Sequence, residues 1–322
     1  MGQARQRFGH YSIADDVLDG IDLTGKTAIV TGASAGLGFE TTRALASHGA
    51  HVVMAVREMK KGKSALEELK RLAPPGNFEL CKLDLSSLES VRAFADEFLS
   101  RHQRLNILIC NAGVMGTGFS ITQDGFERQF GTNHLGHFVL TNRLAPALVA
   151  GAPARVIMLS AFLHALSDVN LEDPNFETTP YRRFESYGQS KTANILFAVE
   201  FDRRFQDRGV RAFALHPGVI LTDLSRYFSA DNLQEMLAEV AKVPGGAKMK
   251  PKTLPQGTAT SVWAATSPAL NGKGGLYLED CQIAETTDPD QAYGVRAYAL
   301  DPESARKLWT LSEKMVGETF NL

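Results

Sequence analysis

Tyr187 and Lys191 lie four residues apart in the stretch SYGQSK, residues 186–191. On a helix this spacing places a phenol and an ammonium group on one face, one turn apart. A tyrosine with its ordinary pKa of about 10 stays protonated at pH 7, and a neighbouring positive charge favours loss of the proton. The pair is a candidate for moving a proton near neutral pH, and an incidental aromatic–lysine pair on a helix is the alternative.

The stretch TGASAGLG, residues 31–38, is a second candidate for chemistry. It follows an apolar run typical of a strand and opens a stretch typical of a helix. Glycines in this context permit a tight turn and a close approach of the backbone to a pyrophosphate, which the helix N-terminus favours. The pattern predicts a dinucleotide site, and a glycine-rich turn without a ligand is the alternative. The predicted contacts are Gly32, Ser34, Ala35, Gly36, Leu37 and Gly38.

Strands and helices alternate from residue 21 onward, and this alternation predicts the fold that positions both candidates. Apolar runs typical of strands cover residues 26–32, 51–56, 78–85, 106–110, 155–159, 210–218 and 274–278. Such alternation is typical of βαβ units and a parallel sheet. We expect an α/β protein with one domain at residues 21–322. It would be a Rossmann-type doubly wound sheet of about seven strands with helices on both faces, preceded by a polar arm at residues 1–20.

Composition excludes several functional classes. The net charge of −2 leaves no electrostatic footprint for nucleic acid or anionic membrane. The N-terminus lacks the apolar region of a secretory signal, and no apolar run approaches the length of a membrane span. Three scattered cysteines fit buried thiols in a reducing compartment, so we expect a cytoplasmic protein. No His/Cys cluster suggests a metal site.

Six motifs resemble, in their order, those of the short-chain dehydrogenase/reductase family. They are TGxxxGxG at 31–38, Asp84, NAG at 111–113, Asn133 in TNHLGHF, YxxxK at 187–191 and PGxxxT at 217–222. The stretches MAVREMKKGK, TNHLGHF and KTANILFAVEFDRR are similar to the branch that contains retinol dehydrogenases and their bacterial relatives. The resemblance covers about residues 22–280. It implies an NAD(P)-dependent oxidoreductase that interconverts an alcohol with its ketone or aldehyde.

The resemblance also implies roles for named residues. Tyr187 would be the general acid/base, Lys191 would in addition hold the nicotinamide ribose, and Asn133 would fix a helix distortion and a proton-relaying water. Asp84 would contact the adenine, although a turn or N-cap role is the alternative for this residue. The other implied cofactor contacts are Leu85, Asn111, Ala112, Gly113, Pro217, Gly218, Ile220 and Thr222.

Acid/base work near neutrality would require the pKa of Tyr187 to fall to about 7, which corresponds to about 4 kcal/mol. An ammonium group about 4.5 Å away supplies roughly 3–4 kcal/mol at an effective dielectric constant near 20. We therefore expect Lys191 to cause most of this fall by itself.

Arg57 bears on the choice of cofactor. NAD-specific sites usually place an acidic residue about 20 residues past the first glycine, at the end of the second strand. Here that strand ends in Ala55-Val56-Arg57, and Glu58 begins the next helix. A guanidinium group can fork onto a 2′-phosphate. We expect a preference for NADP(H), with NAD(H) as the alternative if Arg57 only stacks on the adenine.

The end of the fifth strand departs from the family pattern. The family usually has a serine at the second of two places there, and its hydroxyl polarises the substrate oxygen. This chain has Ser160 followed by Ala161. Loss of one such donor typically costs about 10²–10³ in rate. Either a displaced strand end lets Ser160 act as the catalytic serine, or His164 or Ser167 replaces it, or alanine was substituted to slow turnover. A catalytically weak NAD(P)-binding sensor or scaffold is therefore the alternative function.

Residues 223–255 occupy the place of the family's substrate lid, and apolar residues recur at helical spacing within them. We therefore expect a small hydrophobic alcohol or ketone as the substrate, although the same apolar face could serve as core or as a subunit contact. The helices that carry Asn133 and Tyr187 commonly pair between subunits in this family, which implies a homodimer or homotetramer.

Overall fold

The computed structural model describes residues 8–74, 76–220, 230–243, 246, 249–287 and 293–320. In this part of the chain eight strands form one sheet in the order β3-β2-β1-β4-β5-β6-β7-β8. All neighbours are parallel except β7 and β8, which pair antiparallel. The strands are β1 Thr27–Thr31, β2 His51–Val56, β3 Asn77–Lys82, β4 Ile107–Cys110, β5 Ala154–Leu159, β6 Val210–His216, β7 Leu276–Glu279 and β8 Gln282–Ile283.

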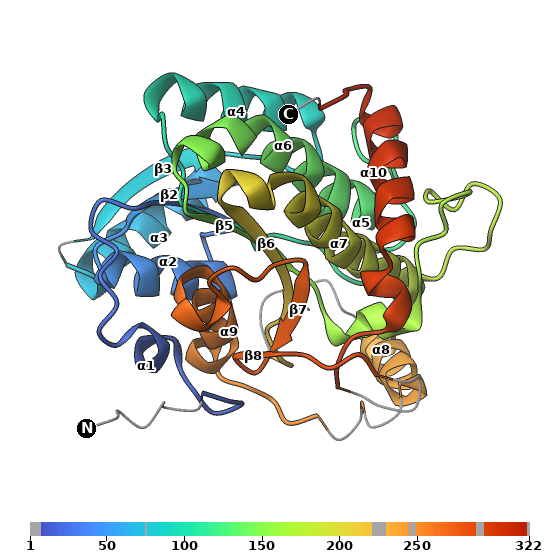
Figure 1. Cartoon of the computed structure of the whole chain (residues 1–322). Helices are drawn as coiled ribbons and strands as arrows, with labels where there is room; N and C mark the ends of the chain where they lie inside the picture. The colour runs from blue at the N-terminus through green and yellow to red at the C-terminus, as the bar shows by residue number, and fades with distance from the viewer. Residues whose placement is uncertain are drawn as a thin grey trace.

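Helices cover both faces of this sheet, as Figure 1 shows. α4, α6, α7 and α10 pack on one face, and α1, α2, α3 and α9 pack on the other. The helices are α1 Ala14–Leu18, α2 Gly36–Ser47, α3 Met59–Leu72, α4 Leu88–Arg101, α5 Arg128–Phe130, α6 Gly136–Ala150, α7 Arg183–Phe205, α8 Ala230–Lys242, α9 Leu254–Thr266 and α10 Pro302–Val316.

The strands are almost wholly apolar because both faces of the sheet are buried. Ala212 and Ala214 of β6 face α7, whereas Phe213 and Leu215, which alternate with them, face the α9 side. This period of two distributes each strand between two separate cores. The doubly wound α/β fold predicted from the sequence is confirmed.

Two details differ from the prediction. The sheet has eight strands rather than about seven, because the chain turns back after β7 and adds the two-residue β8 at the edge. The sequence predicts a polar arm at residues 1–20, but residues 14–18 of this segment are helical. These residues form the short helix α1, whose Ala14 and Leu18 are fully buried in the core on the α9 side of the sheet.

The C-terminal helix α10 closes one side of α7. Its N-cap is Asp301, whose carboxylate accepts the Ser304 N–H, and Pro302 is its first residue. Trp309 is stacked with Phe197 of α7 at 5.8 Å and meets Phe138 of α6 edge-on at 5.1 Å between ring centroids. The side of α6 and α7 beneath α10 is therefore already packed within one chain.

α7 itself is buried along most of its length. Of residues 186–202, every one except Val199 is buried within the single chain. Any pairing of subunits through this helix would have to displace the elements that cover it.

The three cysteines are free and buried, as their positions in the sequence suggested. Within the described ranges, we find no helix with the length and apolar character needed to cross a membrane.

Candidate active site

A cleft of about 300 Å³ opens at the carboxyl ends of β1, β2, β4 and β5. Parallel strands bring these ends to one edge of the sheet, where the loops that follow them meet. Most of the predicted contacts line this cleft: Gly32, Ser34, Ala35, Gly36, Leu37, Arg57, Asp84, Leu85, Asn111, Ala112, Gly113, Ser160, Tyr187, Lys191 and Pro217.

The glycine loop lies tightly against the end of β4. Gly32 has φ of +69°, and a Cβ atom there would lie 3.1 Å from Cα of Ala112. A Cβ atom on Gly38 would lie only 2.4 Å from the carbonyl oxygen of Gly32. Glycine is therefore required at both positions, one for its backbone angle and both for space. Gly38 packs behind the loop, and Gly36 (φ +57°) lines the cleft at the first turn of α2.

A chain of hydrogen bonds connects this loop with the centre of the site. Asn111 Nδ2 donates to the carbonyl of Thr31 (2.8 Å), and the Ala112 N–H donates to Thr31 Oγ1 (2.9 Å). Thr31 Oγ1 lies 3.0 Å from His137 Nε2, and His137 Nδ1 lies 2.9 Å from the carbonyl oxygen of Asn133. A carbonyl can only accept, so Nδ1 of His137 carries the proton and Nε2 accepts from the threonine.

Asn133 lies in a π-helical turn, Gly131–Leu135, between α5 and α6. Turns of this kind inside helices occur often at functional sites. The side chain uses both ends: Oδ1 accepts the Val114 N–H (2.8 Å), and Nδ2 donates to the Val114 carbonyl and to Ser190 Oγ (both 2.9 Å). Asn133 thus joins the loop after β4 to α7, behind the wall of the cleft, at a helix distortion of the kind the resemblance implies.

Tyr187 and Lys191 share one face of α7, as their spacing predicts. The Lys191 ammonium lies 5.4 Å from the centroid of the Tyr187 ring and donates to the Leu159 carbonyl at the end of β5 (3.0 Å). Gly113 lies beside this ammonium: a Cβ atom there would be at ordinary contact distance from Lys191 Nζ (3.5 Å) and more tightly against Asn133 Oδ1 (3.0 Å). Two segments distant in sequence meet here beside the phenol.

Burial sets the electrostatics of this pair. Tyr187 is 5% exposed and Lys191 is 4% exposed. Burial raises the pKa of Tyr187 above its ordinary value and lowers the pKa of Lys191 to about 8, because each charged form loses hydration. The expectation that Lys191 by itself brings the tyrosine pKa towards 7 is not met in this structure, where desolvation outweighs the attraction.

Ser160 and Ala161 have different neighbours. Ser160 Oγ donates to the backbone carbonyl of Lys191 (2.9 Å), whereas Ala161 packs in an apolar cluster with Tyr187 and Leu163. The methyl group of Ala161 therefore lies on the phenol side. Ser160 holds the helix that carries the lysine.

The two replacement donors considered from the sequence are bonded to backbone. His164 Nδ1 lies 2.8 Å from the Ala161 carbonyl, and its Nε2 accepts the Arg296 N–H (3.2 Å). Ser167 Oγ donates to the Asp168 carbonyl (2.7 Å). Neither side chain is arranged as a substitute for a serine hydroxyl beside Tyr187.

The far end of the cleft is charged. Arg57 follows β2, and Glu58 is the N-cap residue of α3, as predicted. The Glu58 carboxylate accepts from Lys61 Nζ (3.0 Å) and lies 3.5 Å from Arg57 Nη2, and the hydrogen bond from Lys61 is the main reason that the pKa of Glu58 is lowered. The cations of Arg57 and Lys61 and the carboxylate of Glu58 thus line the end of the cleft next to β2.

Asp84 contributes to the cleft and to a local turn. Its Oδ1 accepts from the Ser86 N–H (2.9 Å) and from Ser86 Oγ (2.6 Å). The turn role that the sequence left as an alternative is therefore present, and Asp84 also lines the cleft.

Three predicted contacts lie away from this cleft, and a fourth is not described by the structure. Gly38 packs behind the loop, and Gly218 borders a separate small cavity. Ile220 lies against Gly257 of α9: a Cβ atom added to Gly257 would lie 2.7 Å from Cδ1 of Ile220. Thr222 lies outside the described residues, as does part of the predicted lid, residues 223–229.

Comparison with known proteins shows the family. Residues 26–233 match the short chain dehydrogenase family. The chain belongs to the short-chain dehydrogenase/reductase family. It is 41% identical to the short-chain dehydrogenase/reductase prx1 of Penicillium rubens over 298 residues. This aligned region covers 90% of this chain and 85% of that protein. It is 38% identical to retinol dehydrogenase 14 of Homo sapiens, over 91% of this chain and 87% of that protein.

Solved structures show the same architecture. An uncharacterised protein from Mycobacterium paratuberculosis matches with a TM-score of 0.71 and 34% identity, over 94% of this chain and 97% of its own. The RhlG/NADP complex of Pseudomonas aeruginosa matches with a TM-score of 0.63 and 23% identity, over 80% of this chain and 95% of its own. At that identity the second likeness shows the fold alone. The predicted retinol-dehydrogenase-like branch of the family agrees with the relatives found.

Several residues that line the cleft were not predicted from the sequence. The cleft is also lined by Thr31, Ala55, Glu58, Lys61, Leu83, Ser86, Val114, Arg128, Thr132 and Leu159. His137 was missed although it stands in TNHLGHF, four residues after Asn133, a spacing that places both on one helix face. That spacing was the available signal for a buried partner of Asn133.

Buried histidines predict loss of stability in acid. Four histidines have their pKa lowered by burial to about 3 or 4: His134, His137, His164 and His216. Their unfolded pKa is about 6.5, so the unfolded chain binds more protons as the pH falls below that value. The stability that depends on neutral imidazoles is full above pH 6.5 and is lost as the pH falls towards 4. We expect the urea midpoint of unfolding to fall between pH 7.5 and pH 5.

Three carboxyl groups act in the opposite sense, because burial raises the pKa of Glu279 to about 7 and raises those of Glu127 and Asp168, but the four histidines outnumber them. His134→Gln should reduce the pH dependence of the midpoint, because it removes one of these four imidazoles. A midpoint that stays constant from pH 7.5 to pH 5 would contradict this interpretation.

Proposed function

We propose that the protein is an NADP(H)-preferring alcohol dehydrogenase/ketoreductase with hydrophobic substrates. The observation that carries this proposal is the meeting of the Tyr187 phenol and the Lys191 ammonium at one end of a cleft whose middle is lined by a glycine loop. This arrangement unites a proton carrier with a dinucleotide cradle. The family membership supports oxidoreductase chemistry of this kind.

The residues of the cleft fit a nicotinamide dinucleotide. Gly32 and Gly38 let the loop pack tightly on itself and on Ala112, where an added Cβ would come within 2.4–3.1 Å of neighbouring atoms. Ser34, Ala35 and Gly36 then line the cleft at the N-terminus of α2, where a pyrophosphate is favoured. Arg57 would hold a 2′-phosphate, Asp84 and Leu85 the adenine, and Lys191 the nicotinamide ribose. When bound, the cofactor would supply or accept the hydride.

The chain's own groups move and hold the proton. Tyr187 would donate its phenolic proton to the substrate oxygen in reduction and take it back in oxidation. Lys191 is kept beside the phenol by the Leu159 carbonyl and by Ser160, which bonds to the lysine backbone. Asn133 would keep the loop after β4 and α7 at a constant separation through its contacts with Val114 and Ser190.

Apolar side chains around Tyr187 support a hydrophobic substrate. Met115, Phe162, Leu166 and Val240 pack against the cluster that contains the tyrosine. Val240 belongs to α8, so the helix within the predicted lid packs against the apolar cluster that contains Tyr187. An alcohol or ketone that contacts this wall would have to be apolar next to its reacting carbon.

The expected cytoplasmic location and the homodimer or homotetramer belong to the same proposal. Family membership supports assembly, since such enzymes often form oligomers. The burial of residues 186–202 of α7 in one chain favours an interface elsewhere on the surface.

A catalytically weak NAD(P)-binding sensor or scaffold is the second candidate. Ala161 packs beside Tyr187 where the family usually has a serine, and Ser160 is bonded to the Lys191 carbonyl. Absorbance at 340 nm during incubation with hydrophobic alcohols and ketones, with NADP(H) and NAD(H) in parallel, separates the two. Cofactor binding without turnover across the panel would favour the sensor.

Tyr187→Phe removes the phenolic proton and keeps the ring. We expect turnover to fall by at least about 10² with little change in cofactor affinity, since the proton carrier is lost. Steady-state kinetics on a verified substrate, together with cofactor titration, measures both. Activity near that of the unchanged protein would show that Tyr187 is not the acid/base.

Arg57→Ala tests the cofactor preference. Loss of a charge-assisted contact of about 1.5–3 kcal/mol should raise the KM for NADPH by about 10-fold or more and leave that for NADH nearly unchanged. The measurement is the KM for NADPH and for NADH in Arg57→Ala and in the unchanged protein, at one substrate concentration. Equal weakening for both would indicate adenine stacking instead.

Ala161→Ser places a hydroxyl beside Tyr187. If it reaches the substrate oxygen, the added donor acts on the charge that develops in the transition state, so we expect kcat to rise by about 10-fold or more with little change in KM. Ser160→Ala removes the bond to the Lys191 carbonyl and should cost about 0.5–1.5 kcal/mol of stability, with most activity retained. If Ser160→Ala is inactive and Ala161→Ser has the activity of the unchanged protein, then Ser160 is the catalytic donor and position 161 does not face the substrate oxygen.

A further inference from the structure

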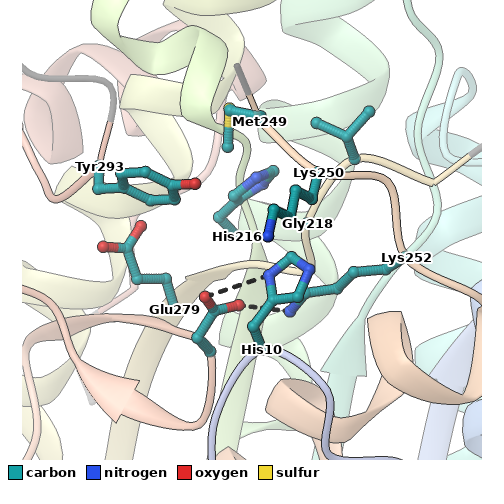
Figure 2. Close-up of a pocket in the computed structure, with 10 residues that line it drawn as sticks. His10, His216, Gly218, Met249, Lys250, Lys252, Glu279 and Tyr293 are labelled. Carbon is teal, nitrogen blue, oxygen red and sulfur yellow. Dashed lines mark hydrogen bonds and ion pairs between the residues drawn. The ribbon is translucent and has the colours of Figure 1, made fainter. Parts of the chain in front are cut away.

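Lys252 is a buried lysine that the proposed chemistry does not use. Its side chain is 2% exposed and forms an ion pair with the Asp280 carboxylate. Figure 2 shows dashed lines from Lys252 and from His10 to the two oxygens of one carboxylate, which belongs to Asp280. A buried ammonium group is costly without such a partner, so its position needs a physical reason.

The cluster around Lys252 is too small to be a ligand site. The cavity that it lines together with His10, His216 and Gly218 measures about 10 Å³, about enough for one water molecule. Both ring nitrogens of His216 are buried without a hydrogen-bond partner among the described residues. Lys252 must therefore act on the parts of the chain that it touches.

Lys252 touches the turn that follows β6. Its backbone N–H donates to the Val219 carbonyl (2.8 Å), next to a bridge between Val219 and Pro251. Gly218 has φ of +105°, and a Cβ atom there would lie 2.6 Å from Lys252 Cδ. The lysine stem thus lies flat against a glycine, whose backbone angle other residues rarely adopt.

The turn has two sides. Pro217 lines the cleft that holds Tyr187 and Lys191, whereas Gly218 and Val219 line the small cavity beside Lys252. A displacement of Lys252 would therefore be transmitted to the nicotinamide end of the cleft. It would leave the glycine loop and Arg57, at the other end, unaffected.

The partners of Lys252 come from two further segments. Asp280 lies in the turn between β7 and β8, where it and Cys281 have positive φ values of 48° and 56°. Such angles are unfavourable for these residues and are kept only where the surroundings enforce them. His10 Nδ1, from the chain before α1, lies 3.5 Å from the second oxygen of the same carboxylate. The N-terminal segment thus closes the outer side of the ion pair.

We infer that Lys252 is a positioning residue for the nicotinamide end of the cofactor. Its stem supports the turn at Pro217–Val219 from behind, and Asp280, backed by His10, holds its ammonium in place. This inference rests on the proposed function, because it concerns the cofactor that the cleft would bind. It also assigns a role to the N-terminal segment that precedes the sheet.

Two probes separate the ends of the cleft. NADPH spans it, whereas adenosine 2′,5′-bisphosphate reaches only the glycine loop and the Arg57 end. Lys252→Met keeps most of the stem and removes the charge. We expect it to weaken NADPH binding by about 10-fold and to leave the affinity for adenosine 2′,5′-bisphosphate unchanged, as measured by calorimetric titration of the full chain.

Lys307→Met is the matched control, since Lys307 of α10 is an exposed lysine in an ion pair with Glu303. It should change neither affinity. His10→Ala removes the outer partner at a partly exposed site and should weaken NADPH binding by about 3-fold, again without effect on the bisphosphate. His10→Ala therefore keeps the inference testable if Lys252→Met does not fold.

Two results overturn the inference. Equal weakening of both probes in Lys252→Met would show general loss of structure, and unchanged NADPH binding would show that the turn needs no support from the lysine. Failure of the proposed function looks different: the unchanged protein would then bind neither NADPH nor NADH, which would remove the basis of the inference as well.

Discussion

The parallel pairing of β1, β2, β4, β5 and β6 is the constraint on which the rest of this structure depends. Parallel strands place all their carboxyl ends at one edge of the sheet, so the loops that follow them meet there. The glycine loop follows β1, Arg57 follows β2, the NAG segment follows β4 and Ser160 follows β5. The cleft is a consequence of strand direction before any side chain contributes to it.

Once the edge is formed, burial decides how its polar groups behave. Lys191 and Tyr187 have their charged forms disfavoured, and every polar atom of Asn133 is bonded to its surroundings. Buried polar groups are usually hydrogen-bonded, and the bonds of Asn133 hold the loop after β4 against α7. Lys252 follows the same rule behind the cleft, where its partner is Asp280.

The C-terminal helix shows how local rules and packing combine. Asp301 and Pro302 are recognisable as a helix start from sequence, because a side-chain acceptor and a residue without an N–H suit the first turn. Where α10 packs is decided by Trp309, which fits between aromatic side chains of α6 and α7. No local pattern in the sequence specifies that partner.

The sequence by itself determined the fold class, the positions of seven strands, the glycine loop and the helical pairing of Tyr187 with Lys191. Each of these follows from short-range spacing or from alternation along the chain, which physical rules translate directly into structure. The tertiary structure alone decided what depends on neighbours distant in sequence. It turned Ser160 towards the Lys191 carbonyl and placed Ala161 beside the phenol. It also reversed the expected effect on the Tyr187 pKa, because desolvation depends on how completely other segments cover the ring, and no spacing within one helix contains that information.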